Sequence, residues 1–205
     1  MDKDFESIFK NIYDKKIWGP DENLSGNGSK IAFNKPYLDF LERFIKQNNI
    51  KNIYDLGCGD FSLMKYFNLS ELNYMGVDVV EDLIDKNNKL YGCSNIKFLH
   101  DDIRSIKIKT PCDLIIIKDV FIHLDNNTIL QVLSNLKNYE RILVTNDFNK
   151  DKAHNININN GEFRQLDINA PPLCVKAECV FEYYSKLTFK KTMLVKGKNF
   201  SANNN

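Results

Sequence analysis

Three small residues at the end of an apolar run give the strongest chemical signal in the sequence. Gly57, Cys58 and Gly59 directly follow Leu56, and Asp55 lies two residues before the first glycine. Glycine allows a ligand to approach bare backbone, and N–H groups at the start of a helix carry partial positive charge. The segment predicts a ligand-binding turn between a buried strand and a helix, with Asp55 placed to order the turn or to bind a cationic group.

Two further acidic residues end the next two apolar runs. Asp78 comes 21 positions after Gly57, with Val79 beside it, and Asp102 precedes Ile103 after the third run. A carboxylate at the first of these places can accept hydrogen bonds from both hydroxyls of a ribose, and one at the second can meet an adenine amino group. Alone, Asp78 could be a helix cap and the glycines an ordinary turn, but together and in register they predict a ligand site.

Candidate proton acceptors follow the fourth and fifth apolar runs. Lys118 and Asp119 end the fourth run, and His123 comes four residues after Asp119, on the same side if the turn is helical. Histidine can act as a base at neutral pH because its ordinary pKa is about 6.5. A histidine that only hydrogen-bonds to backbone is the alternative for His123. Asp147 and His154, after the fifth run, are further candidates.

These residues need a scaffold that brings the ends of several strands together. From residue 51 onward, short apolar runs alternate with helical stretches, which is typical of a sheet with helices on both faces. The run at 114–117 is entirely aliphatic, as expected for a central parallel strand. The expected strands are 52–56, 73–77, 96–99, 114–118 and 141–145, and the expected helices lie at about 61–67, 80–90 and 126–136.

The two ends of the chain add elements to this core. Apolar residues at helical spacing predict a helix over the first fifteen residues, and Asn34 is expected to cap a second helix with Pro36 in its first turn. A loop rich in glycine and serine, with Ser25 and Ser29, lies between them. Near the other end, two β-rich runs predict an antiparallel hairpin, at 179–184 and 188–195.

The predicted fold class is therefore α/β, a Rossmann-like doubly wound sheet that is mostly parallel, with a C-terminal antiparallel hairpin and helices on both faces. A chain of 205 residues suits one domain over 1–200. We expect N-terminal helices and a lid loop in 1–50, a cofactor-binding core in 51–146, a substrate loop and the hairpin in 147–200, and a disordered tail at 201–205.

The composition limits the class of partners. A net charge of +1 lacks the basic excess expected of a protein held mainly by nucleic acid. The sequence has no N-terminal secretory signal and no long apolar window, so we expect a cytoplasmic protein without a membrane segment. The five cysteines form no CxxC pair, so neither a disulfide framework nor a metal site is expected.

The motifs and their order resemble the class I S-adenosylmethionine-dependent methyltransferases. The matching segments, 54–60, 76–78, 100–103 and 113–124, span about 52–145. Short segments in the flanks resemble a small bacterial and viral subgroup. The family often has a further glycine where this chain has Phe61, so the resemblance does not fix the shape of the loop.

The resemblance implies that S-adenosylmethionine is the cofactor. It implies that the loop with Ser25 and Ser29 folds over the cofactor carboxylate, a solvated connector being the alternative. The other implied cofactor contacts are Gly57, Cys58 and Gly59 at the turn, Asp55 at the amino acid end or the loop, Asp78 and Val79 at the ribose, Asp102 and the Ile103 backbone at the adenine, and Lys118.

Two functions of other classes remain open. A nicotinamide-dependent oxidoreductase would use the same glycine turn to bind a pyrophosphate. Ser62, however, occupies the position of the third glycine of that motif, and the Asp55 carboxylate would lie unfavourably close to the pyrophosphate. A catalytically silent partner subunit with the same fold is the second alternative.

The acceptor of the methyl group is expected to be small and polar. A pocket built from Trp18, Phe121, Phe148, Arg164 and the loop at 171–172 would suit a sugar or nucleotide-sugar, with Asp119, His123 or His154 as the base for O-methylation. Nucleic acid is disfavoured because its binding needs several phosphate contacts. A monomer or a homodimer is expected.

Overall fold

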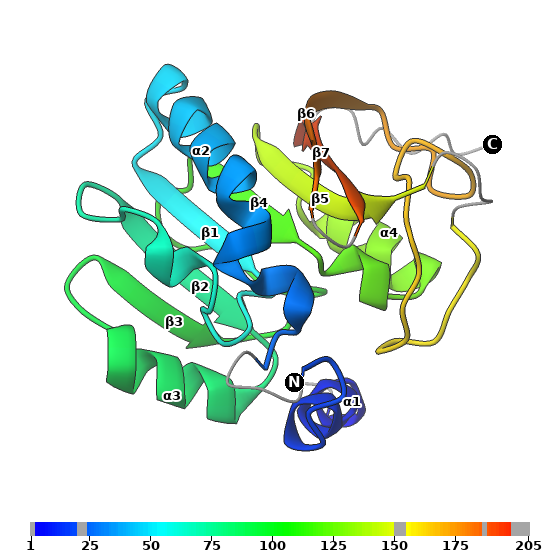
Figure 1. Cartoon of the computed structure of the whole chain (residues 1–205), viewed down its shortest axis with the longest axis horizontal. Helices are drawn as coiled ribbons and strands as arrows, with labels where there is room; N and C mark the ends of the chain where they lie inside the picture. The colour runs from blue at the N-terminus through cyan, green and yellow to red at the C-terminus, as the bar shows by residue number, and fades with distance from the viewer. Residues whose placement is uncertain (1–2, 20–23, 150–154, 186–187, 198–205) are drawn as a thin grey trace.

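The computed structural model of the chain describes residues 3–19, 24–149, 155–185 and 188–197. His154 and the tail expected at 201–205 lie outside these ranges. Within the described ranges, seven strands form one sheet in the order β3-β2-β1-β4-β5-β7-β6 (Figure 1). The strands are β1 (Asn52–Leu56), β2 (Asn73–Asp78), β3 (Ile96–His100), β4 (Leu114–Lys118), β5 (Ile142–Phe148), β6 (Ala177–Tyr184) and β7 (Phe189–Val195).

The first five strands are parallel, and the last two form the antiparallel hairpin that the sequence predicts. The chain order reverses between β1 and β4, which pair directly through Tyr54 and Ile115. Ligands of open α/β sheets bind beside such a reversal, at the carboxyl ends of the strands. The predicted fold class is confirmed, and the glycine turn after β1 lies at this position.

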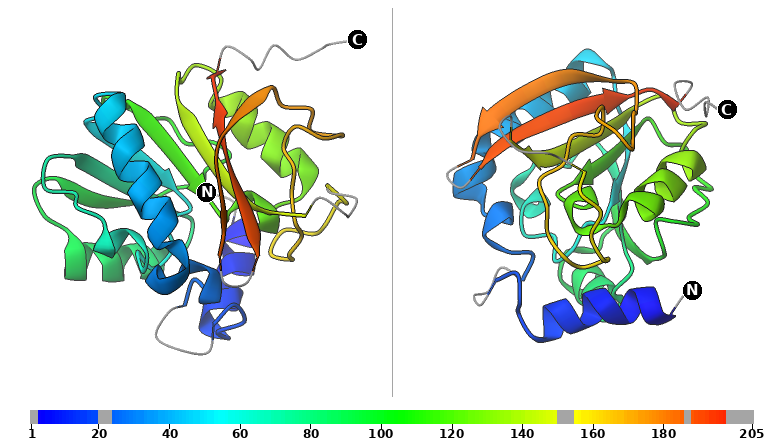
Figure 2. Two further views of the ribbon diagram at one scale, coloured as in Figure 1. Left: turned by 45° about the horizontal axis from the view of Figure 1, so that its top comes forward. Right: turned by 90° about the vertical axis from the view of Figure 1, so that its right-hand side faces the viewer.

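Helices cover both faces of the sheet. The helices are α1 (Lys3–Asp14), α2 (Ile31–Gln47), α3 (Glu81–Tyr91) and α4 (Asn126–Asn135), with 3-10 turns η1 (Asn27–Ser29), η2 (Met64–Tyr66) and η3 (Phe121–His123). Figure 2 shows α2 and α4 on opposite sides of the strands, whereas α1 crosses one end of the molecule. None of the described helices combines the length and the apolar character that crossing a membrane requires.

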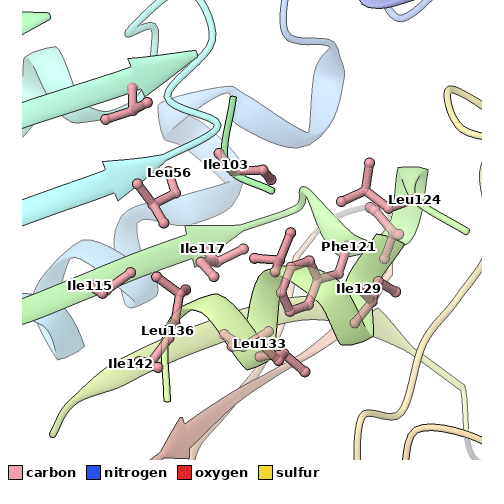
Figure 3. Packing of buried hydrophobic residues seen from close by; sticks show 14 of the residues in the cluster. Leu56, Ile103, Ile115, Ile117, Phe121, Leu124, Ile129, Leu133, Leu136 and Ile142 are labelled. Carbon is pink, nitrogen blue, oxygen red and sulfur yellow. The ribbon is translucent and has the colours of Figure 1, made fainter. Parts of the chain in front are cut away.

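The aliphatic side chains of β4 attach the helices on both faces of the sheet. Leu114 and Ile116 pack in the cluster that contains α2, while Ile115 and Ile117 pack in the cluster that contains α4. All four are at most 1% exposed. Successive side chains of a strand point to opposite faces, so a strand covered on both sides has no polar face. Figure 3 shows Ile115 and Ile117 against side chains of α4, including Leu133.

The prediction of a helix at 61–67 is wrong, because only the 3-10 turn η2 forms there. Phe61 has φ +59, which interrupts a right-handed helix, and its ring packs against three other rings instead. The ring centroids of Tyr74, Tyr91 and Phe98 lie 5.3, 5.1 and 5.0 Å from that of Phe61. Burial of an aromatic side chain thus replaces local helix formation at this place.

Two boundaries also differ from the sequence-based expectation. Helix α2 begins at Ile31, so Asn34 is not its N-cap; the Asn34 side chain instead donates from within the helix to Gly28 O at 2.6 Å and to Lys30 O at 2.9 Å. Strand β5 runs to Phe148, because β7 pairs with its whole length. Asp147 therefore lies inside the strand and not in the loop after it.

Candidate active site

A pocket of about 420 Å³ opens at the carboxyl ends of the parallel strands. Its wall combines the ends of β1, β2 and β4 with three aromatic side chains of α1, namely Phe5, Phe9 and Tyr13. The loop with Ser25 and Ser29 and the β6–β7 hairpin complete it. Segments from both ends of the chain therefore close the edge at which the sequence placed a ligand.

The glycine turn is packed tightly from two sides. Gly57 has φ +80 and Gly59 has φ +55, conformations that L side chains rarely adopt. A Cβ on Gly57 would overlap the side chain of Val120, and one on Gly59 would overlap the Ser25 hydroxyl. Gly57 and Cys58 line the pocket, and both donate from backbone N–H groups to Val77 O, at 2.8 and 3.0 Å.

Asp78 is held at the end of β2 by backbone donors. Its carboxylate accepts from Gly59 N at 3.0 Å and from Val80 N at 3.1 Å, and it lines the pocket together with Val79. Burial raises the pKa of Asp78, although these N–H groups oppose the change. The carboxylate thus lies at the pocket wall with its orientation fixed, where a ribose hydroxyl could reach it.

Asp102 is used differently from Asp78. Its carboxylate is bound by the Arg104 side chain, with Nε to oxygen distances of 3.0 and 2.9 Å, because the arginine reaches back two residues. Ile103 lines the pocket and Asp102 does not. The segment after β3 therefore contributes the apolar side chain of Ile103 to the pocket wall, while the Asp102 carboxylate is held by Arg104.

Asp55 and Lys118 lie at the switch between β1 and β4. Tyr74 donates its hydroxyl to Asp55 Oδ2 at 2.6 Å. Burial raises the pKa of Asp55 to about 6, against the lowering effects of Tyr74 and Lys118. Burial also lowers the pKa of Lys118, whose Nζ lies 5.5 Å from the ring centroid of Tyr37. A carboxylate and an ammonium group thus face the same pocket.

Asp119 is locked between two lysines. It has φ +57, and its carboxylate accepts from Lys118 and, at 2.7 Å, from Lys190 Nζ. Burial alone would raise the pKa of Asp119, but the two ammonium groups lower it to about 2. Sequence reasoning missed Lys190; the available signal was a lysine within the apolar alternation of a strand.

His123 is fixed by a carbonyl and by an indole ring. Its Nδ1 lies 2.9 Å from Glu162 O, and since a carbonyl only accepts, Nδ1 carries the hydrogen. The imidazole stacks on Trp18 with ring centroids 4.3 Å apart. Burial lowers the pKa of His123. The ring is therefore neutral at neutral pH, with its lone pair on Nε2.

The serine loop is tied to the glycine turn and is not a free connector. Ser25 Oγ donates to Asp60 Oδ1 at 2.7 Å, and Asp60 N donates back to Ser25 Oγ at 3.2 Å. Ser29 Oγ donates to Ser25 O at 3.0 Å, and both serines line the pocket. The loop thus forms part of the pocket wall next to the turn.

Several residues expected around the acceptor lie elsewhere. Phe121 is fully buried in the core beside α4 (Figure 3), and Phe148 is not part of the pocket wall. Arg164 donates to Leu124 O at 2.6 Å and to Asn126 Oδ1 at 2.8 Å, so it braces η3 and α4. Trp18 does line the pocket. Among the described residues, no group of three His, Cys, Asp or Glu side chains is placed to hold a metal ion.

The wall fits a nucleoside with a charged sulfur-containing chain. Asp78 gives this wall a carboxylate, and Val79 and Ile103 give it an apolar surface. Ser62 Oγ is buried at the wall without a hydrogen-bond partner in the described part of the chain, as expected of a group that a ligand satisfies. The sheet order and the position of the pocket are those expected of a class I methyltransferase fold.

One segment of the chain matches a family of known proteins. Residues 53–141 match the family model described as a methyltransferase domain. Over this segment, which runs from β1 to the residue before β5, the chain is similar to methyltransferase domains. No curated protein matches the sequence.

Solved structures share the fold over most of the chain. Magnesium protoporphyrin IX methyltransferase (ChlM) from Synechocystis PCC 6803 with bound SAM has a TM-score of 0.63 and 14% identity, over 93% of this chain and 95% of that one. The N-methyltransferase NodS from Bradyrhizobium japonicum WM9 in complex with S-adenosyl-L-homocysteine has a TM-score of 0.63 and 13% identity, over 94% and 97%. At these identities the likeness is one of fold.

Proposed function

We propose that the protein transfers the methyl group of S-adenosylmethionine to a hydroxyl of a small sugar-like acceptor, a sugar or a nucleotide-sugar, with His123 as general base. The observation that carries the proposal is the state of His123. Its Nδ1 hydrogen is committed to Glu162 O, which leaves the Nε2 lone pair for a proton. A base of this kind is needed for a hydroxyl, which must lose its proton as the methyl arrives.

When bound, the cofactor supplies a methyl group on a sulfonium that is open to in-line displacement. The protein must align the acceptor and exclude water. Trp18 fixes the imidazole plane by stacking, and the aromatic side chains of α1 cover the pocket. Asp78 would hold the ribose, Asp55 the ammonium group, and Ser25 and Ser29 would close over the carboxylate.

The character of the wall supports an acceptor whose reacting part is polar and uncharged. Trp18 and Phe163 provide aromatic surface next to His123. The ring centroids of Phe163 and His123 lie 5.9 Å apart. Ser185 and Thr188 add hydroxyl groups on the hairpin side. Apolar C–H faces beside hydroxyl groups are the chemistry of a sugar. The near-neutral net charge gives no support for a nucleic acid.

Cofactor binding is tested by calorimetry with S-adenosylhomocysteine. We expect the wild type to bind at one site and Asp78→Ala to bind at least tenfold more weakly. Asp113→Ala is a matched control, because this aspartate binds backbone N–H groups of Lys51 and Asn52 away from the pocket. Absence of binding by the wild type would reject the proposed function.

Turnover is tested by following S-adenosylhomocysteine formation with a panel of sugars, nucleotide-sugars and amines. We expect the wild type to transfer the methyl group to a hydroxyl. His123→Ala should lose this activity and keep its affinity for the cofactor. Binding without turnover on any member would favour the silent-subunit alternative. Transfer to amines alone would replace O-methylation by N-methylation.

A further inference from the structure

A buried network of opposite charges occupies the hairpin side of the pocket. We call Lys118, Asp119, Asp147 and Lys190 the ion cluster. Lys190 Nζ donates to Asp119 Oδ1 at 2.7 Å and to Asp147 Oδ1, while Lys118 donates to Asp119 Oδ2. Asp147 and Lys190 are direct cross-strand partners of β5 and β7, so their side chains lie on the same face. All four line the pocket.

The fold alone does not require these charges. The Lys190 side chain is only 2% exposed, and burying an ammonium group is costly even when it is paired. Apolar residues of similar size would stabilise such a place at least as well. Charges kept at a pocket wall at this cost indicate that they bind a ligand.

The ion cluster keeps free hydrogen-bonding capacity. An ammonium group has three N–H donors, and Lys190 uses two of them and Lys118 one, counted over the described residues. Asp147 Oδ1 accepts from Lys190 and, at 2.7 Å, from Thr188 Oγ1, whereas Oδ2 has no partner in the described part of the chain. A free donor and a free acceptor thus lie side by side.

The net charge of the ion cluster is zero. Its two ammonium and two carboxylate groups leave no surplus to balance an ionic ligand. The rest of the wall adds the carboxylates of Asp55 and Asp78, so an anionic group would meet repulsion. A hydroxyl group, in contrast, both donates and accepts.

We propose that the ion cluster selects an acceptor whose reacting part is uncharged and carries adjacent hydroxyl groups. Asp147 accepts a hydrogen bond from one hydroxyl, and Lys190 donates to its neighbour. Asp119 positions Lys190 for this contact. The inference rests on the proposed function and narrows its acceptor to vicinal diols.

Matched sugars test the selection on the wild-type protein. Formation of S-adenosylhomocysteine is measured with methyl glucoside, its glucuronic acid counterpart and its glucosamine counterpart, and with the same three forms of galactose. At least one uncharged glycoside is expected to exceed both charged counterparts tenfold in kcat/KM. Preference for a charged member would overturn the inference, as would no transfer to any uncharged glycoside by protein that binds S-adenosylhomocysteine. If the wild-type protein does not bind S-adenosylhomocysteine, the proposed function itself is overturned.

A charge-balanced variant tests the residues. Asp147→Asn combined with Lys190→Met removes one charge of each sign, and KM for the uncharged glycoside should rise at least tenfold while the Kd for S-adenosylhomocysteine stays within twofold. Thr188→Val, which removes one donor to Asp147, is a milder variant and should raise KM severalfold. Lys191→Met is the control, because Lys191 is the next residue of β7 and pairs with Glu182 at 3.4 Å. An unchanged KM in the folded double variant would overturn the inference.

Discussion

His123 and Asp119 lie in the same pocket wall, yet their surroundings give them opposite properties. Two ammonium groups lower the pKa of Asp119 to about 2, so it holds a proton poorly near neutral pH. His123 has no charged hydrogen-bond partner among the described residues, and burial keeps its ring neutral. At the scale of single residues, these properties support the proposal that His123 is the base, with Asp119 as a fixed anion.

The pH dependence of turnover should report His123. Burial lowers its pKa below 6.5, and only the neutral ring can accept a proton. We expect kcat/KM to rise with pH through an apparent pKa below 6.5 and then to level off. In His123→Gln the rate should fall by about 10²–10⁴ and this acid limb should disappear. An unchanged limb in the variant would assign the titration to another group.

Asp55 should make cofactor affinity depend on pH. Its pKa is raised to about 6, so it gains a proton and loses its charge as the pH falls below 6. If it binds the ammonium group, the Kd for S-adenosylhomocysteine should increase as calorimetry moves from pH 8 to pH 5. Asp55→Asn should bind more weakly and show a flat profile, whereas His123→Gln should keep the wild-type pH dependence.

At the scale of elements, the glycine turn is shaped by its neighbours as much as by its own residues. Val120, after β4, packs on Gly57, and Ser25, from the loop after α1, packs on Gly59. The same Ser25 exchanges hydrogen bonds with Asp60. The turn therefore holds its shape only while both neighbouring loops are in place.

Gly57→Ala should disturb this arrangement. A positive φ costs a residue with a Cβ about 1–3 kcal/mol, and the added methyl group would overlap Val120. We expect urea unfolding to show a loss of that size in the free energy of unfolding, and calorimetry to show at least tenfold weaker binding of S-adenosylhomocysteine. Adding Val120→Ala should recover the part of the lost unfolding free energy that comes from the overlap with Val120. It should not recover the part that comes from the positive φ. If Gly57→Ala binds S-adenosylhomocysteine as tightly as the wild type does, this account of the turn is contradicted.

The whole molecule is closed around one site by both ends of the chain. Helix α1 and the β6–β7 hairpin are far apart in sequence, yet both contribute to the pocket wall, and Figure 2 shows α1 across one end of the molecule. A ligand in the pocket thus contacts the core and both flanks at once. Its binding should stabilise the fold as one unit.

Thermal unfolding should show this stabilisation. A ligand present at 100 times its Kd adds about 2.7 kcal/mol, which for a chain of this length raises Tm by about 5–10 °C. We expect S-adenosylhomocysteine to produce such a shift in the wild type and a much smaller one in Asp78→Ala at the same concentration. NAD should produce none. A shift with NAD alone would reinstate the oxidoreductase alternative.

The sequence by itself determined the alternation of strands and helices, the glycine turn and the acids at strand ends. These signals are local or periodic, because burial on two faces requires an aliphatic run such as 114–117 and a tight turn requires glycine. They predicted the fold class, and the glycine turn and Asp78 that they singled out line the pocket. The helix expected at 61–67 failed, because the packing of Phe61 against distant rings prevailed over local propensity.

Only the tertiary structure decided the hairpin side of the pocket. Lys190 reaches Asp119 across 71 positions and Asp147 across 43. Trp18 meets His123 only because α1 crosses the strand ends. Such contacts depend on how β5, β7 and α1 pack together, and no local pattern records that geometry. The physical reason is that a buried charge is stable only beside its partner, and for Lys190 the fold, not the neighbouring sequence, supplies the partners.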